Sequence, residues 1–168
     1  MNTLYITYCS ADKHHIPEGS PKQLYDTQRI TDFITLCEDK HYNWAILSAK
    51  YGLFFPDEVH EYYNVTFWTK SYKCRIKEND ELLSEAESQE RLAQLTNQIS
   101  QRIREKNIKS IVFFYDHPLQ RRKCYLNILH AGADSCRIEH DTCDDLKRHI
   151  SKMFSDGTGK IQLSKAIR

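Results

Sequence analysis

Two lysines, Lys13 and Lys50, each follow a short apolar run and a serine, Ser10 or Ser48. If the two ammonium groups lie close together, each lowers the pKa of the other, which favours a neutral, nucleophilic amine. Alternatively, both lysines stay charged and bind an anion together with the hydroxyls and backbone N–H groups. A third interpretation is that both are solvated loop lysines.

A histidine beside a carboxylate, Asp116-His117, follows the most apolar run of the chain. Histidine titrates near neutral pH, so this pair could act as general acid and base. The alternative is a helix cap, in which Asp116 accepts backbone hydrogen bonds. Cys9, close to Lys13, is a nucleophile of lowered pKa if His117 comes within reach, and otherwise a small core residue.

Aromatic residues and a glycine follow the second lysine. Tyr51 and Tyr63 could stack on a nucleobase, a contact worth about 1–3 kcal/mol, or could simply pack in the core. Gly52 is placed where a left-handed turn or a close backbone approach to a ligand needs glycine, and an ordinary turn explains it equally well.

A basic run, Arg121-Arg122-Lys123, could contact a phosphate backbone or form a solvated helix face. The 24 basic and 23 acidic residues leave a net charge of +1. Any nucleic-acid surface must therefore be a local basic patch.

Alternating strands and helices must position these residues. Four strands are predicted, at residues 4–8, 44–47, 111–115 and, more weakly, 136–138. Residues 53–77 are rich in aromatic residues but lack clean periodicity, and predict a long functional loop. We expect an α/β fold, a three-layer sandwich with a short, mostly parallel sheet of about four strands and helices on both faces. Ligands bind at the carboxyl edge of such sheets, where the candidate residues lie.

Helix signals separate the strands. Ser20-Pro21 with Gln23 and Ser84 with Glu87 are predicted N-terminal caps, with Thr27 an alternative to the first. Pro118 and Thr142 are predicted to begin two further helices. Each of the four predicted helices has an apolar stripe at helical spacing. In chain order these are Ile30, Phe33, Ile34 and Cys37; Leu92, Leu95, Ile99 and Ile103; Leu119, Leu126 and Leu129; and Leu146, Ile150, Met153 and Phe154. We predict one domain over residues 1–155 and a flexible tail over 156–168.

Composition bounds the class of protein. Of 168 residues, 40% are hydrophobic and 28% charged, which is typical of a globular domain, and no run approaches the roughly 18 apolar residues of a membrane helix. The first four residues lack a secretory layout, so we expect a cytoplasmic protein. We accordingly predict that the six cysteines are reduced, and their spacing includes no C-x-x-C zinc signature. No cofactor is assigned.

Two segments carry a family resemblance. Tyr8-Cys9-Ser10-Ala11-Asp12-Lys13, followed by Leu24-Tyr25, resembles the opening of a little-characterised domain family and, more loosely, the cysteine-x-x-x-lysine turn of the archaeosine synthase catalytic domain. Ile46-Leu47-Ser48-Ala49-Lys50-Tyr51-Gly52-Leu53, followed by Pro56-Asp57 and Tyr63-Asn64-Val65-Thr66, is similar to a segment of the peroxide-stress protein YaaA family. The resemblance covers roughly residues 4–67 and implies a nucleic-acid or nucleobase setting.

The function predicted is a nucleobase- or nucleotide-recognising protein, with modification of a nucleic-acid base or nucleotide as the activity if it is an enzyme. Lys13, Lys50, Asp116 and His117 are its candidate catalytic residues. The candidate substrate-binding residues are Cys9, Ser10, Tyr25, Ser48, Tyr51, Gly52 and Tyr63. The alternatives are a non-enzymatic DNA-binding protein of oxidative-stress protection, using Arg121, Arg122 and Lys123, and a small interaction domain without a ligand. No membrane partner is expected.

Overall fold

A six-stranded sheet forms the centre of the fold in a computed structural model that describes residues 2–115, 122–139, 147–153 and 160–163. Its strand order is β11-β10-β9-β1-β3-β4, and the four central strands run parallel. The two outer strands pair antiparallel with their neighbours. The strands are β1 (Thr3–Tyr8), β3 (Asn43–Ser48), β4 (Gly52–Phe54), β9 (Ser110–Tyr115), β10 (Lys147–Met153) and β11 (Lys160–Leu163).

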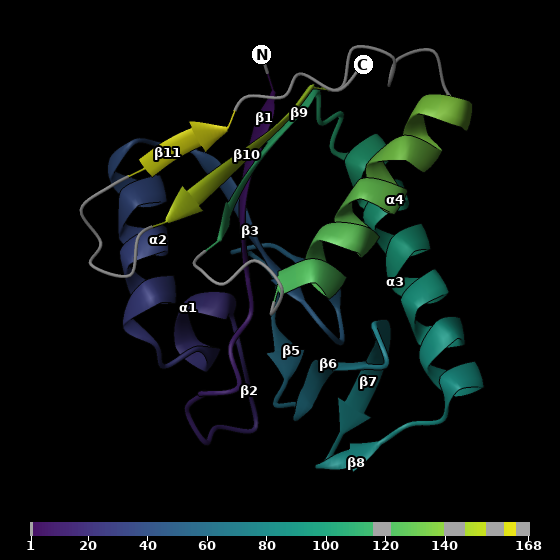
Figure 1. Cartoon of the computed structure of the whole chain (residues 1–168). Helices are drawn as coiled ribbons and strands as arrows, with labels where there is room; N and C mark the ends of the chain where they lie inside the picture. The colour runs from purple at the N-terminus through teal and green to yellow at the C-terminus, as the bar shows by residue number, and fades with distance from the viewer. Residues whose placement is uncertain (1, 116–121, 140–146, 154–159, 164–168) are drawn as a thin grey trace.

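In the described ranges, four helices accompany this sheet: α1 (Pro21–Leu24), α2 (Gln28–Asp39), α3 (Glu85–Glu105) and α4 (Lys123–Glu139). Figure 1 shows α2 on one side of the sheet and the paired α3 and α4 on the other. The ring of Phe33 in α2 lies 5.7 Å from that of Phe114, while Tyr125 in α4 lies 5.4 Å from Tyr8. The chain thus has a mixed α/β fold with a mostly parallel sheet, and none of its described helices is long and apolar enough to cross a membrane.

Both predicted capping boxes are confirmed. Ser20 and Gln23 exchange hydrogen bonds at the start of α1, and Ser84 and Glu87 do so at α3. Thr27 then occupies the N-cap position of α2, so the two alternatives at the first helix correspond to two successive helices. Its buried hydroxyl has no hydrogen-bond partner among the described residues. Cys37 is fully buried on α2, as the apolar stripe predicted.

The predicted loop at residues 53–77 is wrong, because this stretch contains strands. β5 (His60–Glu61) pairs with β2 (Glu18–Gly19), and β6 (Val65–Lys70), β7 (Lys73–Glu78) and β8 (Glu81–Leu82) form a three-stranded sheet. The turn between β6 and β7 uses Ser71 and Tyr72 with φ of 50° and 64°. A turn of this kind usually carries asparagine or glycine, so its residues concealed the hairpin.

Two predictions near the C-terminal end are also wrong. Residues 136–138, predicted as a strand, are the end of α4, because Ile128, Leu129 and Cys136 continue its buried face. Residues 147–153, predicted within a helix, form β10, because pairing with β9 supplies backbone hydrogen bonds that override the helical spacing. β11 lies within the range predicted as a tail, and Thr142 and Pro118 lie outside the described residues.

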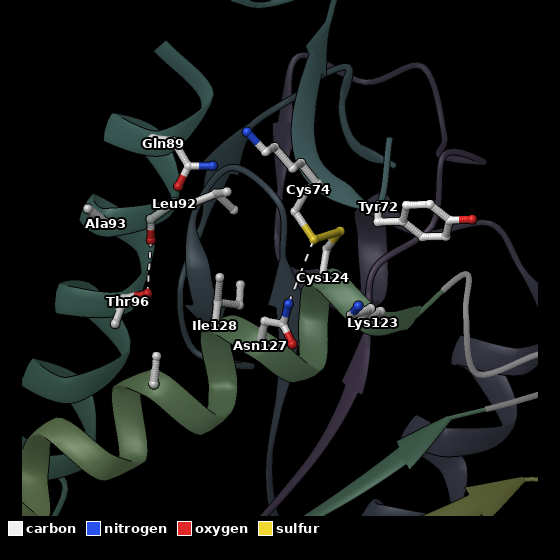
Figure 2. Close-up of a pocket in the computed structure, with 12 residues that line it drawn as sticks. Tyr72, Cys74, Gln89, Leu92, Ala93, Thr96, Lys123, Cys124, Asn127 and Ile128 are labelled. Carbon is white, nitrogen blue, oxygen red and sulfur yellow. Dashed lines mark hydrogen bonds between the residues drawn. A yellow bond between two sulfur atoms is a disulfide. The ribbon is translucent and has the colours of Figure 1, made fainter. Parts of the chain in front are cut away.

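The expectation that all cysteines are reduced is wrong for one pair. Cys74 of β7 and Cys124 of α4 form a disulfide across a sequence separation of 50 residues, with a Cα–Cα distance of 5.7 Å (Figure 2). Hairpin folding brings the two residues together, which sequence spacing alone could not show. Cys9, Cys37 and Cys136 are buried and take no part in this disulfide, and Cys143 lies outside the described residues.

Candidate functional site

The carboxyl ends of β1 and β3 lie side by side. Tyr8 pairs with Leu47 at the last step of the parallel ladder, and the Cys9 amide donates a 3.0 Å hydrogen bond to the Leu47 carbonyl. Cys9 and Ser48, the next residues on each strand, are both buried. The predicted meeting of the two motif segments at one sheet edge is therefore confirmed.

Lys13 is brought back toward this edge by pairing of its backbone with Tyr25. Its exposed fraction is only 7%, which is rare for a lysine without an ion pair, and none is present in the described part of the chain. The ammonium Nζ lies 4.1 Å from the centroid of the Tyr63 ring and 5.8 Å from that of Tyr25. An aromatic face attracts a cation, so these rings partly replace the water that the ammonium has lost.

Tyr25 and Tyr63 also contribute hydroxyl groups to the surroundings of Lys13. Their phenol oxygens are hydrogen-bonded to each other, and the buried Ser48 hydroxyl acts on the pKa of both, opposing the effect of burial. Burial raises the pKa of each phenol well above its usual range, so both stay neutral and can donate or accept a hydrogen bond. Ser48 Oγ also accepts from the amides of Lys50 at 3.1 Å and Tyr51 at 3.0 Å.

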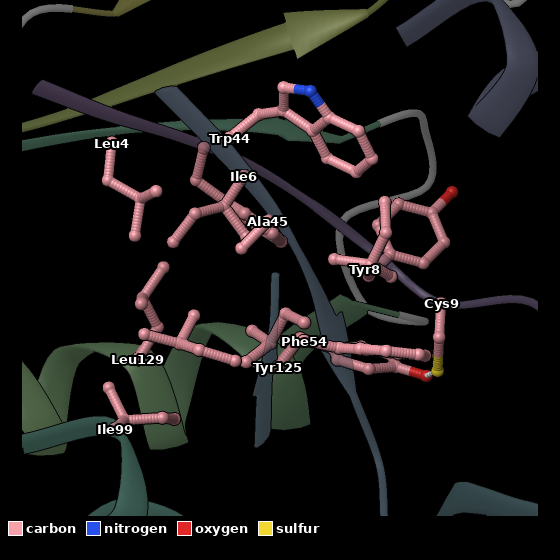
Figure 3. Packing of buried hydrophobic residues seen from close by; sticks show 14 of the residues in the cluster. Leu4, Ile6, Tyr8, Cys9, Trp44, Ala45, Phe54, Ile99, Tyr125 and Leu129 are labelled. Atoms are coloured by element: carbon pink, nitrogen blue, oxygen red, sulfur yellow. Dashed lines mark hydrogen bonds between the residues drawn. The ribbon is translucent and has the colours of Figure 1, made fainter. Parts of the chain in front are cut away.

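Cys9, the residue that follows β1, also lies near Lys13. Its Sγ lies 3.1 Å from the Tyr125 hydroxyl of α4. Figure 3 shows the two side chains facing each other. Burial raises the pKa of Tyr125 well above its usual range. The sequence prediction missed Tyr125, although its spacing of four residues from Leu129 was a signal that it lies on the buried face of the helix.

Burial lowers the pKa of Lys13 below its ordinary value of 10.5, while Cys9 and Asp12 oppose this shift. The sequence-based mechanism, in which Lys50 lowers the pKa of Lys13, is wrong, because desolvation is the cause. A lysine with a lowered pKa has a larger fraction of neutral amine, which is the nucleophilic and basic form. We call the group that surrounds this amine the Lys13 cluster: Cys9, Lys13, Tyr25, Ser48, Tyr63 and Tyr125.

Lys50 lies in a separate, open pocket of about 300 Å³, which we call the Lys50 pocket; it is lined by Ala49, Lys50, Tyr51, Arg91, Gln94, Leu95 and Gln98. Lys50 Nζ lies 5.3 Å from the Tyr51 ring centroid. The Tyr51 ring in turn contacts Tyr63 edge-on, with centroids 5.2 Å apart. Tyr51 therefore separates the open pocket from the closed Lys13 cluster. Its other contacts are a stacked His60 at 4.2 Å and a 3.1 Å hydrogen bond to the Glu61 carbonyl.

A family of unknown function, DUF6884, has a model that matches residues 4–117. The chain belongs to this family. No curated protein and no solved structure matches the chain. The matched DUF6884 range extends from β1 through β9 and contains every member of the Lys13 cluster except Tyr125.

Gly52 in the DUF6884 match has the left-handed φ of 67° that its position predicted. A Cβ atom there would lie 2.2 Å from Oε1 of Gln98 on α3. That amide accepts a 3.0 Å hydrogen bond from the Leu53 amide and donates one of 3.3 Å to the Leu53 carbonyl. The glycine therefore supplies the left-handed conformation and also allows α3 to approach the sheet edge, a packing role that neither interpretation of the sequence named.

The remaining predicted residues do not join the Lys13 cluster as a group. Ser10 accepts a 3.1 Å hydrogen bond from the Asp12 amide, a local turn. Arg122 lies over the Tyr8 ring, with Cζ 4.3 Å from its centroid, and Lys123 is exposed. Asp116, His117 and Arg121 lie outside the described residues.

Arg29 of α2 is a further residue that the sequence prediction missed. It donates to Thr7 Oγ1 at 2.8 Å and to the carbonyls of Tyr8 at 2.9 Å and Cys9 at 3.3 Å. These contacts hold the end of β1 in place beneath the candidate site. Its position on the polar side of an amphipathic helix gave no sign of this role.

Proposed function

We propose that this DUF6884 protein recognises a nucleobase or nucleotide at the carboxyl ends of β1 and β3. The observation that carries the proposal is the burial of Lys13 beside Cys9 and the Tyr63 ring, with no ion pair in the described residues. Perturbed ionisable groups of this kind gather at functional sites. The resemblance to YaaA proteins and archaeosine synthase supports the choice of ligand, and a cytoplasmic location stays a prediction.

In this proposal, the ligand enters through the Lys50 pocket and reaches the Lys13 cluster from there. The volume of this pocket is at the lower end of the range for small-molecule sites. Lys50 supplies positive charge for a phosphate, and Arg91 beside it is already paired with Glu78 at 3.1 Å. Gln94 supplies an amide, and Tyr51 supplies an aromatic edge beside the Lys13 cluster. We infer that the helices form two outer layers around the sheet, which leaves this edge accessible.

An enzyme of base or nucleotide modification is the activity that fits such a site. Lys13 is the residue that we expect to act as a base or nucleophile, through the fraction of its amine that a lowered pKa leaves neutral. The neutral phenols of Tyr25 and Tyr63 can orient a ligand by hydrogen bonds. The alternative of DNA binding through Arg121, Arg122 and Lys123 gains no specific support, since Arg122 packs on Tyr8.

Calorimetric titration with nucleobases, nucleosides and mononucleotides tests the proposal. Wild-type protein is compared with Lys13→Met, Lys50→Met and a control, Lys40→Met, which removes an exposed lysine at the end of α2. We expect a ligand that the control binds normally and that both site variants bind at least about tenfold more weakly, as loss of one charged contact of about 1.5–3 kcal/mol implies. Equal affinity in all four folded proteins would exclude the site.

A further inference from the structure

The β6–β7 hairpin presents basic residues on one face. Its register pairs Thr66 with Lys77, Trp68 with Arg75, and Lys70 with Lys73. Side chains of directly paired residues point to the same side of a sheet and alternate along each strand. One face therefore carries Thr66, Trp68, Lys70, Lys73, Arg75 and Lys77, which we call the outer hairpin face.

The opposite face of the hairpin is already occupied. Phe67 packs edge-on against Tyr125 with ring centroids 4.6 Å apart, Ile76 is buried, and Cys74 is joined to Cys124. The hairpin is thereby fixed to α4, and its basic face is turned toward solvent. The exposed fraction of Trp68 is 52% and that of Tyr72, at the tip, is 92%.

Three basic residues of the hairpin already have partners within the fold: Lys73 pairs with Glu85, Arg75 donates to the Leu83 carbonyl, and Lys77 Nζ lies 5.3 Å from the Trp68 ring centroid. Two other features of the hairpin do not favour folding. Lys70 and Lys73 are directly opposite each other, an arrangement in which like charges repel. Tyr72 occupies a left-handed conformation that asparagine or glycine would adopt more easily. Strained and like-charged positions of this kind point to a binding role.

We propose that the outer hairpin face binds single-stranded nucleic acid. The basic side chains match the phosphate charges, and Lys73, although paired with Glu85 at 2.6 Å, is exposed and can exchange partners. The rings of Trp68 and Tyr72 offer planar surfaces on which unpaired bases stack, whereas bases within a duplex are already stacked. This surface is separate from the Lys13 cluster, so the inference goes beyond the proposed nucleotide site and does not depend on it.

Fluorescence anisotropy of a labelled oligothymidine of about 12 nucleotides tests the inference, a length within the roughly 4–16 nucleotides that a whole OB-fold covers. Trp68→Ala is expected to weaken binding about 5- to 100-fold, the loss of one stacked base. Lys70→Gln with Lys77→Gln is expected to lower the slope of log affinity against log salt by about 1.4. The control, Lys22→Gln with Lys40→Gln, makes the same charge change on exposed residues near α1 and α2 and is expected to bind like wild type.

Two additional measurements distinguish single-strand binding from loss of the fold and from general attraction to polyanions. Tyr72→Asn relieves the left-handed tyrosine, so we expect a higher melting temperature together with weaker oligonucleotide binding, which unfolding cannot produce. Heparin and a duplex of the same length are expected to bind more weakly than the single strand. The inference is overturned if heparin or the duplex binds as tightly as oligothymidine, if Trp68→Ala binds like wild type, or if wild type does not bind.

Discussion

Burial of the Lys13 ammonium against the Tyr63 ring has an energetic cost that depends on pH. The residue lies in a loop after β1, where an ordinary lysine would extend into water. Because burial lowers its pKa in the folded protein, the charged form is disfavoured there relative to the unfolded chain. A cost at one residue that folding does not need is typical of a site kept for function.

Lys13→Met is predicted to stabilise the protein at pH 7, because it removes the buried charge and keeps a flexible side chain of similar length. Between the lowered folded pKa and the ordinary value of 10.5, the unfolded wild type binds more protons than the folded one. The unfolding free energy of wild type therefore rises with pH relative to that of the variant. The stability advantage of Lys13→Met over wild type is accordingly smaller at high pH. Urea denaturation of both proteins from pH 7 to 10.5 measures it. A difference independent of pH would contradict the lowered pKa.

Gly52→Ala is predicted to lower the unfolding free energy by about 1–3 kcal/mol, the cost of one residue in a disfavoured conformation. Its Cβ would also meet Gln98, so that amide must move. The double variant with Gln98→Ala relieves the clash but keeps the left-handed φ. Denaturation curves should therefore show less than the sum of the two single losses. Simple additivity would mean that the two residues do not interact.

At the scale of elements, the parallel strands of the core could be predicted because their signals are local. Buried apolar runs at β1, β3 and β9 and the capping hydroxyls of α1 and α3 each act within a few residues. Their adjacency then followed from the geometry of crossover connections, which brought Cys9 and Ser48 together. The β6–β7 hairpin could not be predicted because its turn lacks glycine and asparagine. β10 could not be predicted because its pairing with β9, which is distant in sequence, determines it.

The disulfide between β7 and α4 is an element-scale link that sequence could not reveal. We predict that Cys74→Ser with Cys124→Ser lowers the unfolding free energy by about 2–4 kcal/mol, as expected for a bond that closes a loop of this length. Dithiothreitol should destabilise wild type by a similar amount and leave the double variant unchanged. Alkylation of both cysteines in unreduced, denatured wild type would show that the bond is absent.

At the scale of the whole molecule, Tyr125 connects two surfaces with different proposed roles. Its hydroxyl contacts Cys9 of the Lys13 cluster, and its ring packs on Phe67 beneath the outer hairpin face. The sequence predicted the sheet edge but neither the hairpin nor this connection. Residues from β1, β6 and α4 meet only after the chain has folded, which is why local patterns did not show it.

Variants of one surface should leave binding at the other surface unchanged. Trp68→Ala and the Lys70→Gln with Lys77→Gln pair are predicted to weaken oligonucleotide binding and leave mononucleotide binding unchanged. Lys13→Met should do the reverse, because its side chain is buried away from the hairpin face. The same calorimetric and anisotropy titrations measure both. Equal losses of both ligands in every variant would mean that the two surfaces form one site.

The pKa of Lys13, measured with and without a ligand, tests the central claim most directly. Proton titration of the lysine Nζ and Cε signals by NMR, with Lys13→Met to assign the resonance, gives its pKa with and without a bound nucleotide or nucleobase. We predict a pKa below 10.5 in the free protein and a ligand-induced change at Lys13 that the exposed Lys40 does not show. An ordinary pKa at Lys13, with no response to any nucleobase or nucleotide, would contradict the account.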